Sequence, residues 1–321
     1  MKRLRLAIAL HRSLPPEILT EIFLHYAAEI LQCFINRPPW YTGCDCLWPF
    51  PWVLSRICSR WRRIALAEPR IWCTVGFGTV EQCDVPILNE AFRRGGKSPL
   101  WLSAGEWHGD VYDSFLRDVV CSQSKRIMEL TLTIYWETFE DFLALPKDPF
   151  PVLESVQLSA IQGLGLQPNL RIPDSDLGVF RGAARLRRIC IIQAPLLDVA
   201  SVCFPMNLGL SWSQLTHIDF GTISIQVSIA LGLMERCNAL HECFLLMTDV
   251  HLQVAFPATS IRLPHLRKLA VQEAGPNRSL LAKFVRPLVL PSLEDFDFWL
   301  WKRFWLEDVA SLADLAPIIE G

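Results

Sequence analysis

The cysteines between residues 33 and 58 are the side chains best suited to metal chemistry. Cys44 and Cys46 are separated by one residue, and Cys33 and Cys58 are the other thiols of this stretch. A zinc site usually combines one C-x₂₋₄-C pair with a second such pair, because the metal takes four ligands. A single C-x-C matches that pattern poorly. The sequence therefore predicts a loop packed around its own cysteines and tryptophans, with no metal and no cofactor.

Groups suited to catalysis also fit a structural role better. The segment His241–Cys243 offers an imidazole, a carboxylate and a thiol, but successive side chains of a strand point to opposite faces. Glu294, Asp295 and Asp297 are explained by acidic residues on the solvated face of a strand. The chain contains no phosphate-binding glycine loop, no G-x-S-x-G elbow and no H-E-x-x-H pair. We therefore expect a protein that is not an enzyme.

Charge and composition limit the classes of partner that are expected. The net charge is −2, so no bulk attraction to nucleic acid or to an anionic membrane is expected. The basic turn of Arg60, Arg62 and Arg63 is typical of a solvated helix face. No stretch approaches the roughly 18 apolar residues of a membrane span. The 11 cysteines are an odd number and favour reduced thiols, which predicts the cytoplasm or the nucleus.

The stretch Leu14–Val75 must position most residues that could bind a partner. Its first part, Leu14–Tyr26, has the apolar spacing of one helix face, formed by Ile18, Leu19, Ile22, Phe23 and Tyr26. The second part, Pro51–Val75, repeats that pattern as a helix that Pro69 stops, and Trp72 follows as a large apolar anchor. A unit of this size buries little surface and usually gains stability by docking on another surface.

The motifs of this stretch resemble an F-box. They read L-P-x-E-I-L-x-x-I-F from Leu14, P-W-V-L from Pro51, C-x-R-W-R-x-I-A-L from Cys58 and P-R-I-W from Pro69, and they are most similar to fungal members of the family. The resemblance covers residues 14–75 and implies a three-helix module that binds the Skp-type adaptor, and through it the cullin scaffold, of a ubiquitin ligase. It departs from the family by a long loop at 27–50. The matching adaptor-binding positions are Leu14, Pro15, Ile18, Leu19, Ile22, Leu54, Ile57, Cys58 and Trp61.

An internal repeat begins at Ile127. The form apolar-x-x-apolar-x-apolar recurs every 25 to 33 residues, starting at Ile127, Leu153, Leu186, Leu215, Leu240, Leu266 and Leu293. The residues between the apolar ones are mostly polar, which is typical of short strands with one buried face. Helices are expected between and after the strands at Glu137–Leu145, Asp176–Ala184, Val227–Cys237, Ser279–Phe284 and Trp305–Leu315.

A strand and a helix at this period resemble a degenerate leucine-rich repeat, although the usual asparagine is absent. The alternative is an ordinary α/β domain with parallel strands. The predicted fold class is α/β, with a small helical F-box module followed by a leucine-rich-repeat-like solenoid. The expected parts are a tail at 1–13, the F-box module at 14–75, a linking segment at 76–126 and the solenoid at 127–321.

The expected target site lies on the C-terminal half of the repeats. Residues two and four positions after each start should line one face, and there the acidic residues outnumber the basic ones. Exposed apolar side chains beside these acids favour a basic, partly apolar protein segment as partner. The candidate residues are Phe244, Leu246, Asp295, Asp297 and Trp299. The alternative is that Trp305–Leu315 covers them as a cap.

Two functions remain open. In the first, the chain is the substrate-recognition subunit of an SCF-type ligase, with the adaptor on its F-box and an unidentified target on its repeats. In the second, it is a non-catalytic scaffold whose F-box-like segment only caps the solenoid. An enzyme is a distant third.

Overall fold

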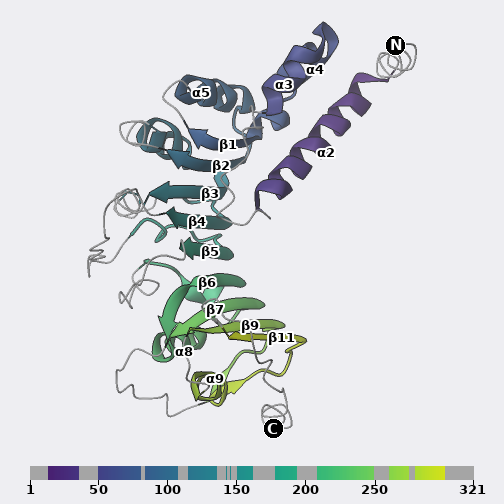
Figure 1. The fold of residues 1–321 in the computed structure, drawn as a ribbon. Helices are drawn as coiled ribbons and strands as arrows, with labels where there is room; N and C mark the ends of the chain where they lie inside the picture. The colour runs from purple at the N-terminus through teal and green to yellow at the C-terminus, as the bar shows by residue number, and fades with distance from the viewer. Residues whose placement is uncertain are drawn as a thin grey trace.

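The fold is mixed α/β and centres on a nine-stranded parallel sheet (Figure 1). The computed structural model describes residues 14–35, 50–80, 84–107, 115–135, 142, 145, 150–161, 178–193, 208–248, 260–274 and 279–300. The strands of the sheet are β1 (Thr74–Val80), β2 (Leu100–Trp107), β3 (Ile127–Tyr135), β4 (Ser155–Ile161), β5 (Arg188–Gln193), β6 (His217–Gln226), β7 (Glu242–Thr248), β9 (Lys268–Ala274) and β11 (Asp295–Leu300). Two short strands, β8 (Ile261–Arg262) and β10 (Leu288–Val289), form a separate parallel pair.

The strands lie in the sheet in the order in which they occur in the chain. The central apolar residues of the seven predicted repeats pair side by side, from Leu130 through Val156, Ile189, Ile218, Cys243 and Leu269 to Phe296. The strands predicted from the repeat, and their register, are therefore confirmed. The segment 76–126, expected to be a link, instead contributes β2 and most of β1 to the same sheet.

The two faces of the sheet differ in what they bury. Leu130, Ile189, Ile218 and Leu269 point into the core and are almost fully buried. The alternate residues form the opposite face, which we call the open face. Its two rows are Glu129, Ser155, Arg188, His217, Glu242, Lys268 and Asp295, and Thr131, Gln157, Cys190, Asp219, Phe244, Ala270 and Asp297. The members of both rows are half-buried or exposed.

Helices cover the buried face in the C-terminal half. The predicted helices Val227–Cys237 and Ser279–Phe284 correspond to α8 (Val227–Arg236) and α9 (Ser279–Val285). Helix α8 packs on β6 and β7 and also contacts α9. The helix predicted at Asp176–Ala184 is wrong over 178–184, where the chain forms turns instead. Trp305–Leu315 and most of Glu137–Leu145 lie outside the described residues.

The N-terminal helices stand at the β1 end of the sheet (Figure 1). They are α2 (Pro16–Ile35), α3 (Phe50–Ile57) and α4 (Ser59–Ala67), followed by the short helix η1 (Pro69–Cys73). Beyond η1, α5 (Asp84–Gly95) packs on η1 and β1, and a π-helix, η2 (Phe115–Cys121), follows β2. Among the described helices, none is both long enough and apolar enough to cross a membrane.

Two predictions about the N-terminal helices are corrected. The loop expected at 27–50 is wrong over 27–35 and at residue 50, because α2 continues through residue 35 and α3 begins at Phe50. The single helix expected after Pro51 is two helices, because Cys58 adopts an extended conformation between them. Its thiol accepts a hydrogen bond from the backbone N–H of Trp61, which caps the start of α4.

Candidate functional site

Helix α2 attaches to the rest of the chain through one apolar face. Leu19, Phe23 and Ala27 recur every fourth residue and are almost fully buried. They face α4, η1 and β1, the elements that α2 contacts. The ring of Phe23 lies 4.8 Å from that of Trp61 on α4, measured between centroids. This face fixes α2 against the first strand of the sheet.

A second apolar face of α2 remains exposed. Ile18 and Ile22 each keep 47% of their surface accessible, and Tyr26 keeps 51%. These residues also recur every fourth position, one residue before the buried set, so they lie about 100° away around the helix. The continuous stripe expected from the sequence is therefore two stripes, one buried within this chain and one exposed.

Helix α3 divides in the same way. Val53 and Ile57 lie four residues apart, about one helical turn, and both are exposed. Leu54, next to Val53, is buried. Large exposed apolar side chains on surface helices are a common mark of a protein-binding surface. We call Ile18, Ile22, Tyr26, Val53 and Ile57 the helical apolar surface.

The predicted adaptor residues therefore separate into two groups. Leu19 and Leu54 are corrected, because they are already buried in this chain and have no surface to offer a partner. Pro15, Ile18, Ile22 and Ile57 are exposed, whereas Leu14, Cys58 and Trp61 are half-buried. Sequence reasoning left Tyr26 and Val53 out of the site, although each lies four residues from a chosen position and so shares its helix face.

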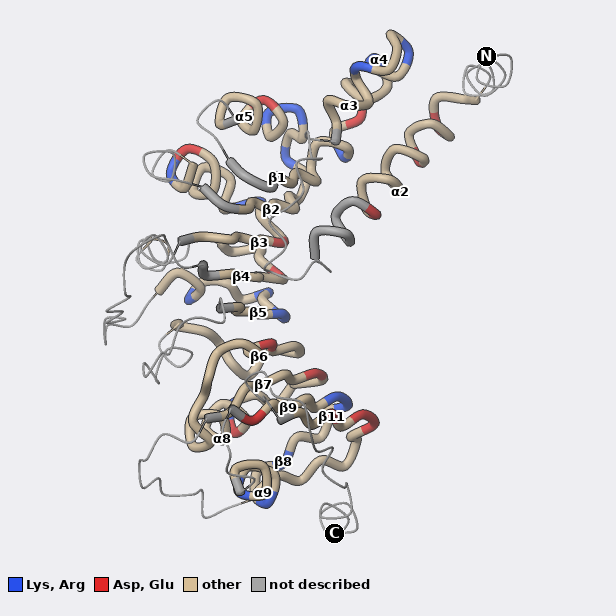
Figure 2. Tube along the Cα trace, in the orientation of Figure 1, with Lys and Arg blue, Asp and Glu red and all other residues tan. Residues whose placement is uncertain are grey.

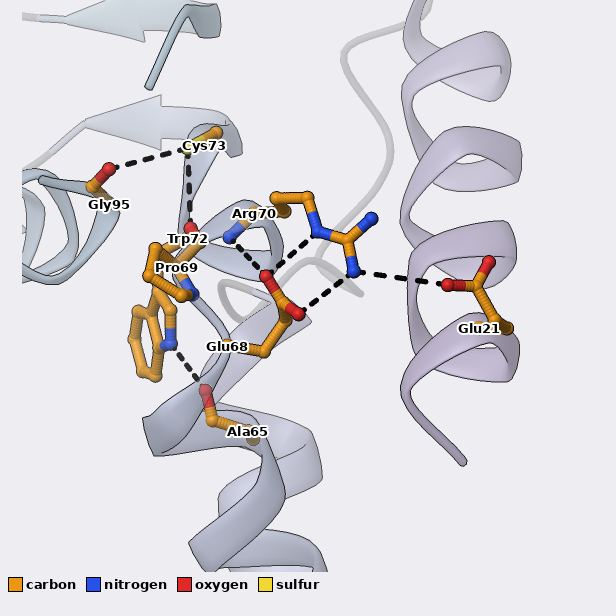
Figure 3. A network of polar contacts seen from close by, with 8 residues as sticks. All are labelled: Glu21, Ala65, Glu68, Pro69, Arg70, Trp72, Cys73 and Gly95. Atoms are coloured by element: carbon orange, nitrogen blue, oxygen red, sulfur yellow. Dashed lines mark hydrogen bonds and ion pairs between the residues drawn. The ribbon is translucent and has the colours of Figure 1, made fainter. Parts of the chain in front are cut away.

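Polar contacts hold α2 to the segment that leads into the sheet (Figure 3). The carboxylate of Glu68 accepts hydrogen bonds from the backbone N–H and the guanidinium of Arg70, at 2.9 to 3.0 Å. The same guanidinium lies 3.8 Å from a carboxylate oxygen of Glu21 on α2. The hydrogen bond from Arg70 lowers the pKa of Glu68. This pair keeps its charge at neutral pH and bridges η1 to α2.

Trp72 is the buried anchor of the same junction. Its indole N–H donates a 2.6 Å hydrogen bond to the carbonyl of Ala65 (Figure 3). The ring of Trp52 on α3 meets it edge-on with 4.8 Å between centroids, and the guanidinium of Arg94 lies 4.7 Å from its ring centre. Trp72 therefore links α3, α4 and α5, as its sequence position as an apolar anchor predicted.

Two arginines of the basic turn on α4 form hydrogen bonds to neighbouring segments. Arg60 donates to the carbonyl of Leu14, and Arg62 donates a 2.7 Å hydrogen bond to the carbonyl of Ser55. These two guanidiniums connect α4 to the start of α2 and to α3. Their role in tying the helices together was not foreseen, because the sequence favoured a solvated face.

The open face holds an aromatic pair in its C-terminal half. The rings of Phe244 on β7 and Trp299 on β11 lie 5.7 Å apart at an interplanar angle of 65°. Strand β9 runs between them, and there it carries the small residue Ala270 beside Phe244. On the other side, Phe244 lies over Gly221, where an added Cβ would come within 2.3 Å of the ring.

The other predicted target-binding residues are placed as follows. Leu246 is corrected, because it is only 2% exposed and cannot contact a partner. Asp295 is half-buried, with a carboxylate oxygen 3.7 Å from the ammonium of Lys268. Asp297 and Trp299 are exposed. The structure thus brings Phe244, Asp297 and Trp299 to one face.

The metal and catalytic candidates do not form a site among the described residues. No group of three or more histidine, cysteine or acidic side chains there is arranged to hold a metal ion. Cys44, Cys46 and the side chain of Cys33 lie outside the described part. In the segment His241–Cys243, Glu242 is exposed and Cys243 is buried, as alternation on a strand predicts.

No family model matches the chain, and no curated protein is significantly similar to it.

Proposed function

We propose that the chain is a non-catalytic recognition subunit that binds the Skp-type adaptor of a cullin–RING ubiquitin ligase through its N-terminal helices. The proposal combines the F-box-like motifs with the helical apolar surface. In it, residues 14–75 are the F-box, and the in-register parallel strands are a leucine-rich-repeat-like solenoid that holds a target. Ubiquitin transfer belongs to other subunits, and this chain contributes proximity.

The observation that carries the proposal is the second apolar face of α2. A helix that only capped the sheet would need Leu19, Phe23 and Ala27 and nothing more. Ile18, Ile22 and Tyr26 are each about half exposed, so burying the remainder under a partner contributes about 1 kcal/mol for each residue. A free chain gains nothing from leaving them in water.

The second candidate function, a scaffold with a helical cap, rests on a separate observation. Helix α2 contacts α4, η1 and β1, the first strand of the sheet, which supports a cap at that end. Capping and adaptor binding use different faces of α2, so the two functions are tested separately.

The test is co-purification of the full chain with a recombinant Skp-type adaptor. We expect Ile18→Asp to weaken adaptor binding at least about thirtyfold, because it places a charge in the centre of a desolvated contact. Folding should be retained, because Ile18 lies outside the core. The matched control is Val289→Asp, which changes an exposed apolar residue on β10 and should leave binding unchanged. Equal binding by wild type and Ile18→Asp would remove the adaptor proposal and leave the scaffold.

A further inference from the structure

We infer that the open face binds a cationic side chain, arginine or lysine, of an extended protein segment at Phe244, Trp299 and Asp297. This inference rests on the proposed function, in which the sheet recruits a target, and it gives the chemistry of that target.

The first observation is the geometry of the two rings. Phe244 and Trp299 meet at 65° with their centroids 5.7 Å apart, so they form two walls of a corner. Trp299 leaves 46% of its surface exposed. An aromatic face offers its negative quadrupole to a cation, and tryptophan does so best. The exposed part of Trp299, beside the half-buried Phe244, also supplies apolar area for the methylene stem of a long basic side chain.

The second observation concerns the residues that lie beside the rings of Phe244 and Trp299. Ala270 follows Phe244 in the second row of the open face, and Asp297 follows Ala270. Along β9, Ala270 is the residue beside Phe244 and Gln272 the one beside Trp299. On the β6 side, only the absence of a Cβ at Gly221 lets the Phe244 ring approach this closely. Gly221 therefore helps to position the aromatic corner.

The third observation is the balance of charge around the corner. Figure 2 shows acidic residues on β6, β7 and β11, and β9, which lies between β7 and β11, carries one basic residue, Lys268. The nearest cation of the open face, Lys268, is already 3.7 Å from Asp295. Glu242 has His217 at 3.7 Å. Asp297 is exposed and has no ion pair among the described residues, so it provides the uncompensated carboxylate.

Charge complementarity indicates which kind of segment binds beside Phe244, Asp297 and Trp299. An acidic partner or a nucleic acid would meet Asp295 and Asp297 with like charge, and desolvating those carboxylates without a counter-ion is unfavourable. A purely apolar segment would cover the rings but leave Asp297 buried without a cation. A segment with arginine or lysine beside an apolar residue satisfies both the rings and the carboxylate.

The experiment selects a displayed library of random twelve-residue peptides on the immobilised full chain. We expect the enriched peptides to carry arginine or lysine next to an apolar residue. Their affinity for the full chain should fall at least about tenfold in Trp299→Ala and several-fold in Asp297→Asn, and it should fall with added salt. Gly221→Ala should also weaken binding, because it displaces the Phe244 ring.

Matched controls separate this inference from the proposed function. Val289→Ala removes exposed apolar area elsewhere, and Asp118→Asn removes an exposed carboxylate on η2. Neither should change peptide affinity. Ile18→Asp should keep peptide binding while it loses the adaptor, and Trp299→Ala should do the reverse. Enrichment of acidic or uncharged peptides, enrichment of none, or equal binding by Trp299→Ala would overturn the inference, whatever the adaptor result.

Discussion

The pKa values of Asp219 and Cys190 on the open face depend on burial and on their contacts across the strands. Asp219 on β6 accepts a 3.0 Å hydrogen bond from the backbone N–H of Gly221 and shares a hydrogen bond with the thiol of Cys190 on β5. Burial nevertheless raises the pKa of Asp219 above its ordinary value. Burial, together with the charge of Asp219, also raises the pKa of the Cys190 thiol. Cys190 is therefore a hydrogen-bonding group and a poor nucleophile.

The raised pKa of Asp219 predicts a pH-dependent stability difference. Because the folded state binds this proton more tightly than the unfolded state, stability falls as pH rises from the ordinary aspartate value through the raised one. Asp219→Asn removes that fall and keeps the acceptor for Gly221. We expect its free energy of unfolding, relative to wild type, to increase across that window in urea titrations between about pH 3 and 7. A difference independent of pH would contradict the prediction.

At the scale of elements, α2 has two apolar faces with opposite roles. The inward face holds the helix to the sheet, and the outward one is about half exposed. The two adjacent residues Leu19 and Ile18 therefore form a matched pair for mutation, with the same helix and nearly the same side-chain volume.

We expect Leu19→Ala to lower the free energy of unfolding by about 2–5 kcal/mol, because it removes buried methylene groups and leaves a cavity. Ile18→Ala should change it by less than about 1 kcal/mol, because half of that side chain is already in water. Urea denaturation of both variants measures the difference. Similar losses from the two substitutions would show that α2 does not bury only one of these faces.

The strands could be predicted from the sequence more completely than the faces of α2, for physical reasons. The strand register from β3 to β11 followed from a sustained period, because each unit must pair its apolar residues with those of the next. The split of α2 could not be predicted, because a wide apolar stripe does not say which half the chain itself covers. Leu246 shows the same limit. Alternation predicted the face from which it projects, but not its burial between Ser224 and Gln272.

At the scale of the whole molecule, the strands of the sheet pair over unequal lengths. The shortest of the pairings compared below is that between β5 and β6, which we call the seam. Strands β3 and β4 stay in register from Glu129 to Tyr135, whereas β5 pairs with β6 only over Arg188–Cys190. Beyond that point β6 continues with β7, and their register shifts after Phe220. Contacts such as the 2.8 Å hydrogen bond from the Gln214 amide to the carbonyl of Ala183 add some support at the seam.

We expect native-state hydrogen exchange to find this seam. Amides that bond between β5 and β6 should be protected at least about tenfold less than those between β3 and β4, because fewer ladder bonds must break for the seam to open. The β3–β4 amides serve as the internal reference in the same sample. Uniform protection across the two regions would mean that the sheet opens as one unit.

The agreement between strand order and chain order has a consequence for synthesis on the ribosome. Each repeat strand starts to pair with the one made 25 to 33 residues earlier, and at about 5–20 residues per second this interval lasts roughly 1 to 7 seconds. None of the described strands of the sheet must wait for a distant partner from the end of the chain. Helix α2 emerges before the sheet, however, and its inward face has no β1 to pack against until Thr74–Val80 has been translated. During that delay both of its apolar faces are open to chaperones.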